Sequence, residues 1–144
     1  MKHQAFLKAL REDEIVAAIQ QAEQKTSGEI RVFVSRKRIE TPVMAAQAAF
    51  VRLSMTKTRE RNGVLIFVAP RTHKFAVVGD EGVHARCGDG FWRRLADEMM
   101  GHFKKGEFTE GLVHGVHTAG NLLAQHFPHR PDNRNELPDR VAHD

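Results

Sequence analysis

The sequence of 144 residues predicts a single-domain α/β protein in which a short mixed β-sheet packs against helices. Two features of the sequence predict this class. The first is the order of a β-rich run, Glu29–Ser35, a helical pattern and a second β-rich run, Val64–Ala69, which favours a parallel pair of strands. The second is a short turn, Pro70–His73, between that run and Lys74–Val78, which favours an antiparallel hairpin.

Helices are predicted where apolar residues recur with the period of an α-helix. The predicted segments are about Glu12–Lys25, Thr41–Met55, Glu81–Arg86, Gly90–Lys105 and Thr109–Phe127. Ser27 and Gly28 end the first helix, and Pro42 favours the first turn of the second. In the last helix, Gly111 and Gly115 predict close backbone approach, because glycine has no side chain to keep a neighbour away.

Residues 1–127 are expected to form the α/β domain, and residues 128–144 a proline-rich, polar extension with Leu137 and Val141 as apolar anchors. Hydrophobic residues make up 41% of the chain and charged residues 28%, as in soluble globular proteins. The longest apolar run, 64–69, is far shorter than the roughly 20 residues of a membrane span. The first residues lack the pattern of a secretory signal, so we expect a cytoplasmic protein without a membrane span.

The formal net charge of +4 makes nucleic acid a partner to consider. The basic clusters at 36–38 and 52–61 have Glu29, Glu40 and Glu60 beside them, and no aromatic residues alternate with the basic ones. We therefore expect these clusters to be solvated faces, with no nucleic acid partner.

Polar residues gather at one edge of the predicted sheet. Glu29 opens the first strand, Asn62 precedes the second and Asp80 closes the third, so the three can converge there. Their carboxylate and amide oxygens suit Ca²⁺ or Mg²⁺, and Asp89 on the following loop could add a ligand. Two structural alternatives stay open: Asp80 caps the next helix, or Glu29 pairs with Arg61.

A ligand could also bind at the opposite edge. Open α/β sheets usually bind ligands beyond the carboxyl ends of their parallel strands, which here are Ser35 and the segment Ala69–Arg71. This edge is a competing location for a site.

Two further patterns have a simpler structural interpretation. Cys87 and Arg93 have the spacing of cysteine-dependent phosphatases, but Asp89 between them would repel phosphate, and a small, partly buried cysteine is the alternative. His114 and His117 are one helical turn apart and could face one metal ion. A third ligand is not evident, so two solvated histidines are the alternative there.

Several segments together resemble one protein family: Ala22-Glu23, Thr26–Ile30, Glu60–Ile66, Gly79–Gly82, Trp92, Phe108–Gly111 and Asn135–Asp139. They resemble the TPM domain, a thylakoid-lumen acid phosphatase-like family formerly described as a domain of unknown function, over about Leu10 to Val141. The resemblance implies a three-layer α/β/α sandwich of the TPM type. For some relatives it also implies acid-phosphatase activity, divalent-cation binding, or roles in photosystem repair and receptor assembly.

Two functions are open from the sequence. The first is a metal-assisted phosphomonoester hydrolase, in which a Ca²⁺ or Mg²⁺ ion on Glu29, Asn62, Asp80 and Asp89 activates a water and polarises the phosphoryl group. Its catalytic candidates are Asp80 and Arg61, with Arg61 stabilising phosphate charge. The second is a non-catalytic, cation-binding adaptor that contacts a protein partner. Neither function requires an organic cofactor.

Overall fold

The computed structural model describes residues 10–88, 90–129 and 138–144. Its strands are β1 (Glu29–Val34), β2 (Gly63–Ala69), β3 (Lys74–Gly79) and β4 (Ala142–His143). Its helices are α2 (Glu12–Glu23), α3 (Pro42–Arg52), α4 (Glu81–Cys87), α5 (Gly90–Lys104) and α6 (Phe108–His126). The four strands form one sheet in the order β3-β2-β1-β4.

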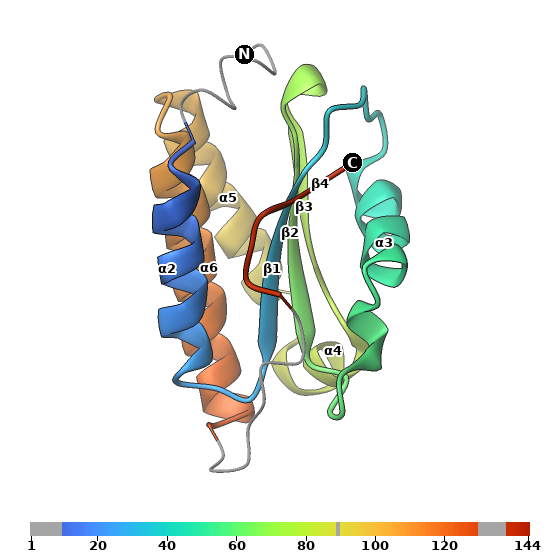
Figure 1. The fold of residues 1–144 in the computed structure, drawn as a ribbon, viewed down its shortest axis with the longest axis vertical. Coiled ribbons are helices and arrows are strands. Elements are labelled where there is room, and N and C mark those ends of the chain that lie inside the picture. The colour runs from blue at the N-terminus through green and yellow to red at the C-terminus, as the bar shows by residue number, and fades with distance from the viewer. Residues whose placement is uncertain (1–9, 89, 130–137) are drawn as a thin grey trace.

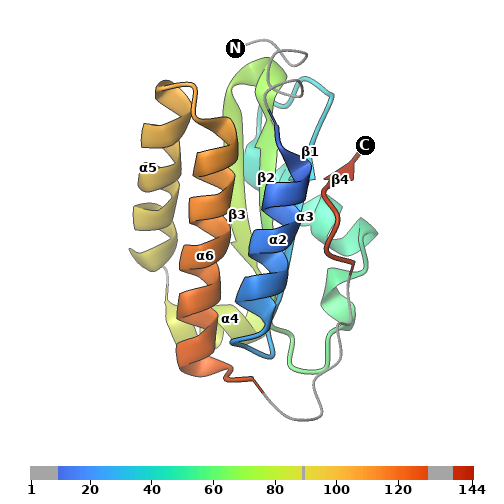
Figure 2. The same ribbon diagram turned by 60° about the vertical axis from the view of Figure 1, so that its left-hand side comes forward.

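Helices cover both faces of this sheet. Helices α2, α6 and α5 lie side by side on one face, and α3 lies on the other (Figures 1 and 2). Every residue of β1 and β2 is buried, as expected for parallel strands between two helical layers. The predicted three-layer α/β/α sandwich with a mixed sheet is therefore confirmed.

The strand register places the candidate residues at one edge of the sheet. β1 and β2 are parallel with Glu29 opposite Gly63, and β2 and β3 are antiparallel with Val64 opposite Gly79. The starts of β1 and β2 and the end of β3 therefore lie together, and the predicted hairpin is confirmed.

The core has two parts, one on each side of the sheet. On the α3 side, Phe33 and Phe67 of neighbouring strands stack with ring centroids 5.3 Å apart. On the other side, α5 and α6 approach closely at the two predicted glycines. A Cβ at Gly115 would lie 2.8 Å from the sulfur of Met99, and one at Gly111 would lie 2.7 Å from the ring of Phe103.

The structure differs from the predicted elements at two places. The second helix ends at Arg52, and a separate 3-10 turn, Met55–Lys57, follows Ser54, whose φ of 61° is left-handed and breaks the helix. The C-terminal extension supplies a strand, because β4 pairs in parallel with β1, a contact between distant segments that local patterns do not predict.

Val141 is 5% exposed and anchors the end of the chain as expected, whereas Leu137 lies outside the described residues. Within the described part of the chain, no helix has the length and apolarity needed to cross a membrane.

Candidate functional site

Glu29, Asn62 and Asp80 all lie at the same edge of the sheet and are buried, with 2%, 1% and 6% of their surface exposed. The backbone N–H of Asp80 donates to the carbonyl of Gly63 at 2.9 Å, and that of Glu29 donates to the carbonyl of Asn62 at 3.4 Å. The predicted convergence of the three chain segments is therefore confirmed. The fourth candidate ligand, Asp89, lies outside the described residues.

The carboxylate of Asp80 is already occupied by protein groups. Nε of Arg61 donates to its Oδ2 at 2.7 Å and Nη2 donates to its Oδ1 at 2.9 Å, which makes a two-point ion pair. Oδ1 also accepts the backbone N–H of Glu81 at 2.8 Å, so Asp80 caps α4. The hydrogen bond to Asp80 raises the pKa of the Arg61 guanidinium. Asp80 thus has the helix-capping contact that the sequence left open as an alternative.

The backbone around this ion pair is tightly constrained. Arg61 has a φ of 53°, a left-handed conformation that is uncommon for a residue with a side chain. The N–H of Gly82 donates to the carbonyl of Arg61 at 3.0 Å, and a Cβ at Gly82 would lie only 2.4 Å from the carbonyl oxygen of Glu60. The start of α4 therefore packs directly on the residues that precede β2.

Three further carboxyl groups lie together at the start of β1. They are those of Glu23, Glu29 and Asp139, and we call them the carboxyl cluster. Glu23, the last residue of α2, accepts the backbone N–H of Ile30 at 3.0 Å through Oε2. Its side chain also shares hydrogen bonds with Asp139 and Glu29. Burial, followed by these two hydrogen bonds and the charge of Glu29, raises the pKa of Glu23 to about 11. Glu23 is therefore protonated at neutral pH.

The surroundings of the cluster are polar and buried. Oδ1 of Asn62 is buried and accepts no hydrogen bond from the described residues, while Nδ2 donates to Ser27 at 3.3 Å and to Glu60 at 3.4 Å. Buried Arg31 lies close enough to Asp139 for that carboxylate to raise its pKa, although burial has the larger, lowering effect. The cluster thus has hard oxygen donors, with Arg31 near Asp139 and Arg140 near Arg31.

The donor chemistry of the cluster fits Ca²⁺ or Mg²⁺, which bind carboxylate and amide oxygens. In residues 10–88, 90–129 and 138–144, no group of three or more His, Cys, Asp or Glu side chains is arranged as a metal site. Glu23 instead makes hydrogen bonds to Glu29 and Asp139, so a cation would have to displace the proton of Glu23 and draw the oxygens together.

Sequence reasoning did not select Glu23 or Asp139 as site residues. Both belong to segments that carry the family resemblance, which was the available signal. Their contact joins the end of α2 to residues near the C-terminus, a separation that helical or strand periodicity does not predict.

The two other candidate sites are explained by local structure. Cys87 ends α4, and burial raises the pKa of its thiol, the opposite of an activated nucleophile. Nε2 of His114 lies 2.8 Å from Oε2 of Glu98, and its ring packs against His102 with centroids 5.5 Å apart. His114 thus contacts α5 through Glu98 and His102.

A hollow of about 190 Å³ lies beside the ion pair, between α3 and the start of α4. It is lined by Gln47, Phe50, Val51, Val78, Gly79, Asp80 and His84. Most of its lining is apolar, with Asp80 and His84 as the ionisable groups.

A family model of the TPM domain matches residues 1–122. Among solved structures, the chain is similar to the BA42 protein of the psychrophilic bacterium Bizionia argentinensis, with 37% identity, a TM-score of 0.86, and coverage of 94% of this chain and 96% of that one. It is also similar in fold to the N-terminal domain of a P. gingivalis protein, with 20% identity, a TM-score of 0.60, and coverage of 79% and 75%. No functionally curated protein matches the chain.

Proposed function

The chain belongs to the TPM domain family, and from this premise we propose that it binds a divalent cation, Ca²⁺ or Mg²⁺, at the carboxyl cluster. The observation that carries the proposal is the pair of hydrogen bonds that partly buried Glu23 makes to Glu29 and to Asp139. Buried carboxyl groups this close cannot all be ionised unless a positive charge joins them. In the absence of a cation, protons fill this role.

The proposal moves the cation site away from Asp80. A divalent ion binds most strongly where several carboxylate oxygens lie together. Arg61 and the N-terminus of α4 already balance the charge of Asp80. In the cluster, by contrast, an ion would replace protons and bring two or three carboxylates into their charged form.

The position of the cluster favours a binding or regulatory role. Glu23 ends α2, Glu29 begins β1 and Asp139 belongs to the segment that leads to β4. A cation held by all three would join these segments and fix the course of the C-terminal segment along β1. This supports the cation-sensitive adaptor, whose surface contacts a protein partner.

A second candidate function is cation-dependent hydrolysis of a phosphomonoester. The hollow beside Asp80 and His84 supports it, because a phosphoryl group there would lie near the ion pair. Arg61 could then bind phosphate oxygens in a two-point contact like the one it makes with Asp80. Hydrolysis would require His84 or a second water molecule to accept a proton from the attacking water.

Thermal unfolding with and without CaCl₂ or MgCl₂ tests the cation site. A cation at 100 times its Kd should stabilise the native protein by about 2.7 kcal/mol. Glu29→Gln should abolish this shift, because it removes a charged ligand and keeps the size of the side chain. Asp80→Asn is the matched comparison at the same sheet edge and should keep the shift, although it lowers the starting stability.

Two results would contradict the site. One is a wild-type protein whose melting temperature responds to neither cation. The other is a cation shift that survives Glu29→Gln and disappears in Asp80→Asn, which would return the ion to Asp80.

Turnover separates the two functions. A hydrolase should release phosphate from a generic aryl phosphate in the presence of Mg²⁺ or Ca²⁺, lose that activity with a chelator, and lose it in Arg61→Gln. An adaptor should show the melting shift and no turnover above that of a mock purification.

A further inference from the structure

The outward face of α3 exposes large hydrophobic side chains to solvent. All large hydrophobic side chains that are exposed within the described residues lie on this helix: Val43 is 53% exposed, Met44 68% and Val51 66%. Ala46, Ala49 and Phe50 of the same helix point into the core. Met44 and Val51 are seven residues, or about two helical turns, apart, and Val43 directly precedes Met44, so the three side chains lie within about 100° of the helix circumference and share one face. They form a ridge, which we call the α3 ridge.

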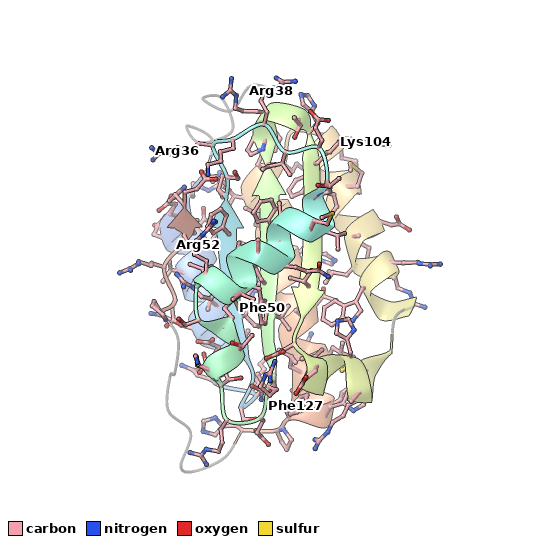
Figure 3. All side chains as sticks on the ribbon, turned by 90° about the vertical axis from the view of Figure 1, so that its right-hand side faces the viewer. Arg36, Arg38, Phe50, Arg52, Lys104 and Phe127 are labelled. Atoms are coloured by element: carbon pink, nitrogen blue, oxygen red, sulfur yellow. The ribbon has the colours of Figure 1, made fainter. Side chains whose placement is uncertain are left out.

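Basic residues surround the α3 ridge. Residues 41–59 contain no Asp or Glu, and Arg52 and Lys57 in this stretch are exposed. The loop before α3 contributes Arg36, Lys37 and Arg38, all exposed. Figure 3 looks onto this face, with α3 in front of the sheet, Arg52 at one side, and Arg36 and Arg38 above it.

Few carboxylates offset this charge. Glu40 borders the face and pairs with Lys74 at 3.4 Å, and Asp144 accepts the backbone N–H of Arg36 at 2.7 Å. Asp144 is also close enough to Lys37 for that charge to lower its pKa. Within the described residues, Arg36, Arg38, Arg52 and Lys57 have no carboxylate within ion-pair distance, and Arg52 instead lies over the ring of Phe33, 5.9 Å from its centroid.

We propose that the α3 ridge docks on the surface of an anionic phospholipid bilayer. Val43, Met44 and Val51 would enter the boundary between headgroups and acyl chains, and the surrounding Arg and Lys side chains would contact lipid phosphates. An apolar helix face flanked by basic residues that no carboxylate of the described residues pairs has the charge and shape that such a surface attracts. The site is separate from the carboxyl cluster and does not depend on it.

Two other occupants fit the face less well. A second copy of the chain, docked through the same face about a two-fold axis, would bring two groups of unpaired basic residues together. A stable protein partner usually needs about 800 Å² on each side and aromatic anchors, whereas the exposed side chains of the ridge are two valines and one methionine. A lipid bilayer adapts to the shape of the helix that docks on it and does not need a complementary surface.

Co-sedimentation with vesicles tests the proposal. The probe is phosphatidylcholine alone or mixed with 30% phosphatidylglycerol, at low salt and at high salt. We expect binding to the mixed vesicles, little binding to the neutral ones, and a loss of binding as salt screens the charges.

Variants separate charge from apolar insertion. Arg36→Gln with Arg38→Gln should weaken binding about thirty-fold, because each basic residue near an anionic surface contributes roughly five-fold. Arg93→Gln with Arg94→Gln makes the same charge change at exposed positions of α5 and should leave binding within about two-fold of the wild type. Met44→Gln with Val51→Gln should weaken binding while keeping all charges.

The proposal fails if wild-type protein does not bind the mixed vesicles. It fails equally if the α5 variant loses as much binding as the loop variant, which would indicate unspecific attraction of a basic protein. Light scattering after gel filtration tests the second copy: a dimer that Met44→Gln with Val51→Gln converts to a monomer would assign the ridge to self-association instead. Circular dichroism of each variant checks that it is folded.

Discussion

Asp80 and the carboxyl cluster both lie at the edge of the sheet where β1 and β2 begin, and their charges are balanced in different ways. Asp80 is held by Arg61 at 2.7 and 2.9 Å and by a helix N-terminus. In the carboxyl cluster, the raised pKa of Glu23 favours its protonated form, and its side chain makes hydrogen bonds to Glu29 and Asp139. One group is neutralised by a fixed side chain and the other by exchangeable protons.

This difference indicates which group can respond to its surroundings. A fixed ion pair stabilises one geometry and has no need of an external cation. A cluster held by protons changes its charge with pH and can exchange those protons for a metal ion. The Asp80–Arg61 pair therefore has a structural role, and the carboxyl cluster is where we propose that a cation binds.

The largest expected effect is on the pH dependence of stability. The pKa of Glu23 is higher in the native protein than in the unfolded chain, so the native state holds a proton that the unfolded state releases. Its contribution to stability is complete below about pH 4.5 and is lost as the pH rises toward 11. Without divalent cations, the wild-type free energy of unfolding should therefore fall as the pH rises through this range.

Glu23→Gln should flatten this dependence, because an amide keeps hydrogen-bonding atoms and has no proton to release. Urea unfolding at several values between pH 5 and 9 measures it. Parallel curves for the wild type and Glu23→Gln would show that the cluster does not hold a proton, and would remove the distinction between the two acidic groups.

The next effect concerns the fixed ion pair. Asp80→Ala removes the cap of α4 and the buried hydrogen bonds that the carboxylate accepts, so the free energy of unfolding should fall by about 2 kcal/mol. Chemical denaturation at pH 7 measures this loss. If Asp80 were instead held in place for cation binding, adding Ca²⁺ would stabilise the wild type and not Asp80→Ala; we expect equal stabilisation of both.

At this edge of the sheet, the sequence predicted how the strands pair better than it predicted which side chains contact one another. The strand periods and the short turn required Asn62 and Asp80 to be neighbours, and they are. Arg61 pairs with Asp80 rather than with Glu29, and its left-handed φ of 53° is a backbone conformation that no local pattern predicts. The position of Asp139 could not be predicted for another reason. β4 and the segment before it join the sheet only through contacts with residues far away in the sequence.

The smallest effect is expected at Cys87, at the far end of the helix that Asp80 caps. Its thiol has a raised pKa and only partial burial, so it contributes neither a reactive thiolate nor much packing energy. Cys87→Ser should change the free energy of unfolding by less than about 1 kcal/mol and leave the cation shift unchanged, because neither acidic group contacts it. Chemical denaturation and the CaCl₂ melting shift measure the two quantities. A phosphatase activity that vanished in this variant while the protein stayed folded would instead identify Cys87 as a nucleophile and place the chemistry outside both acidic groups.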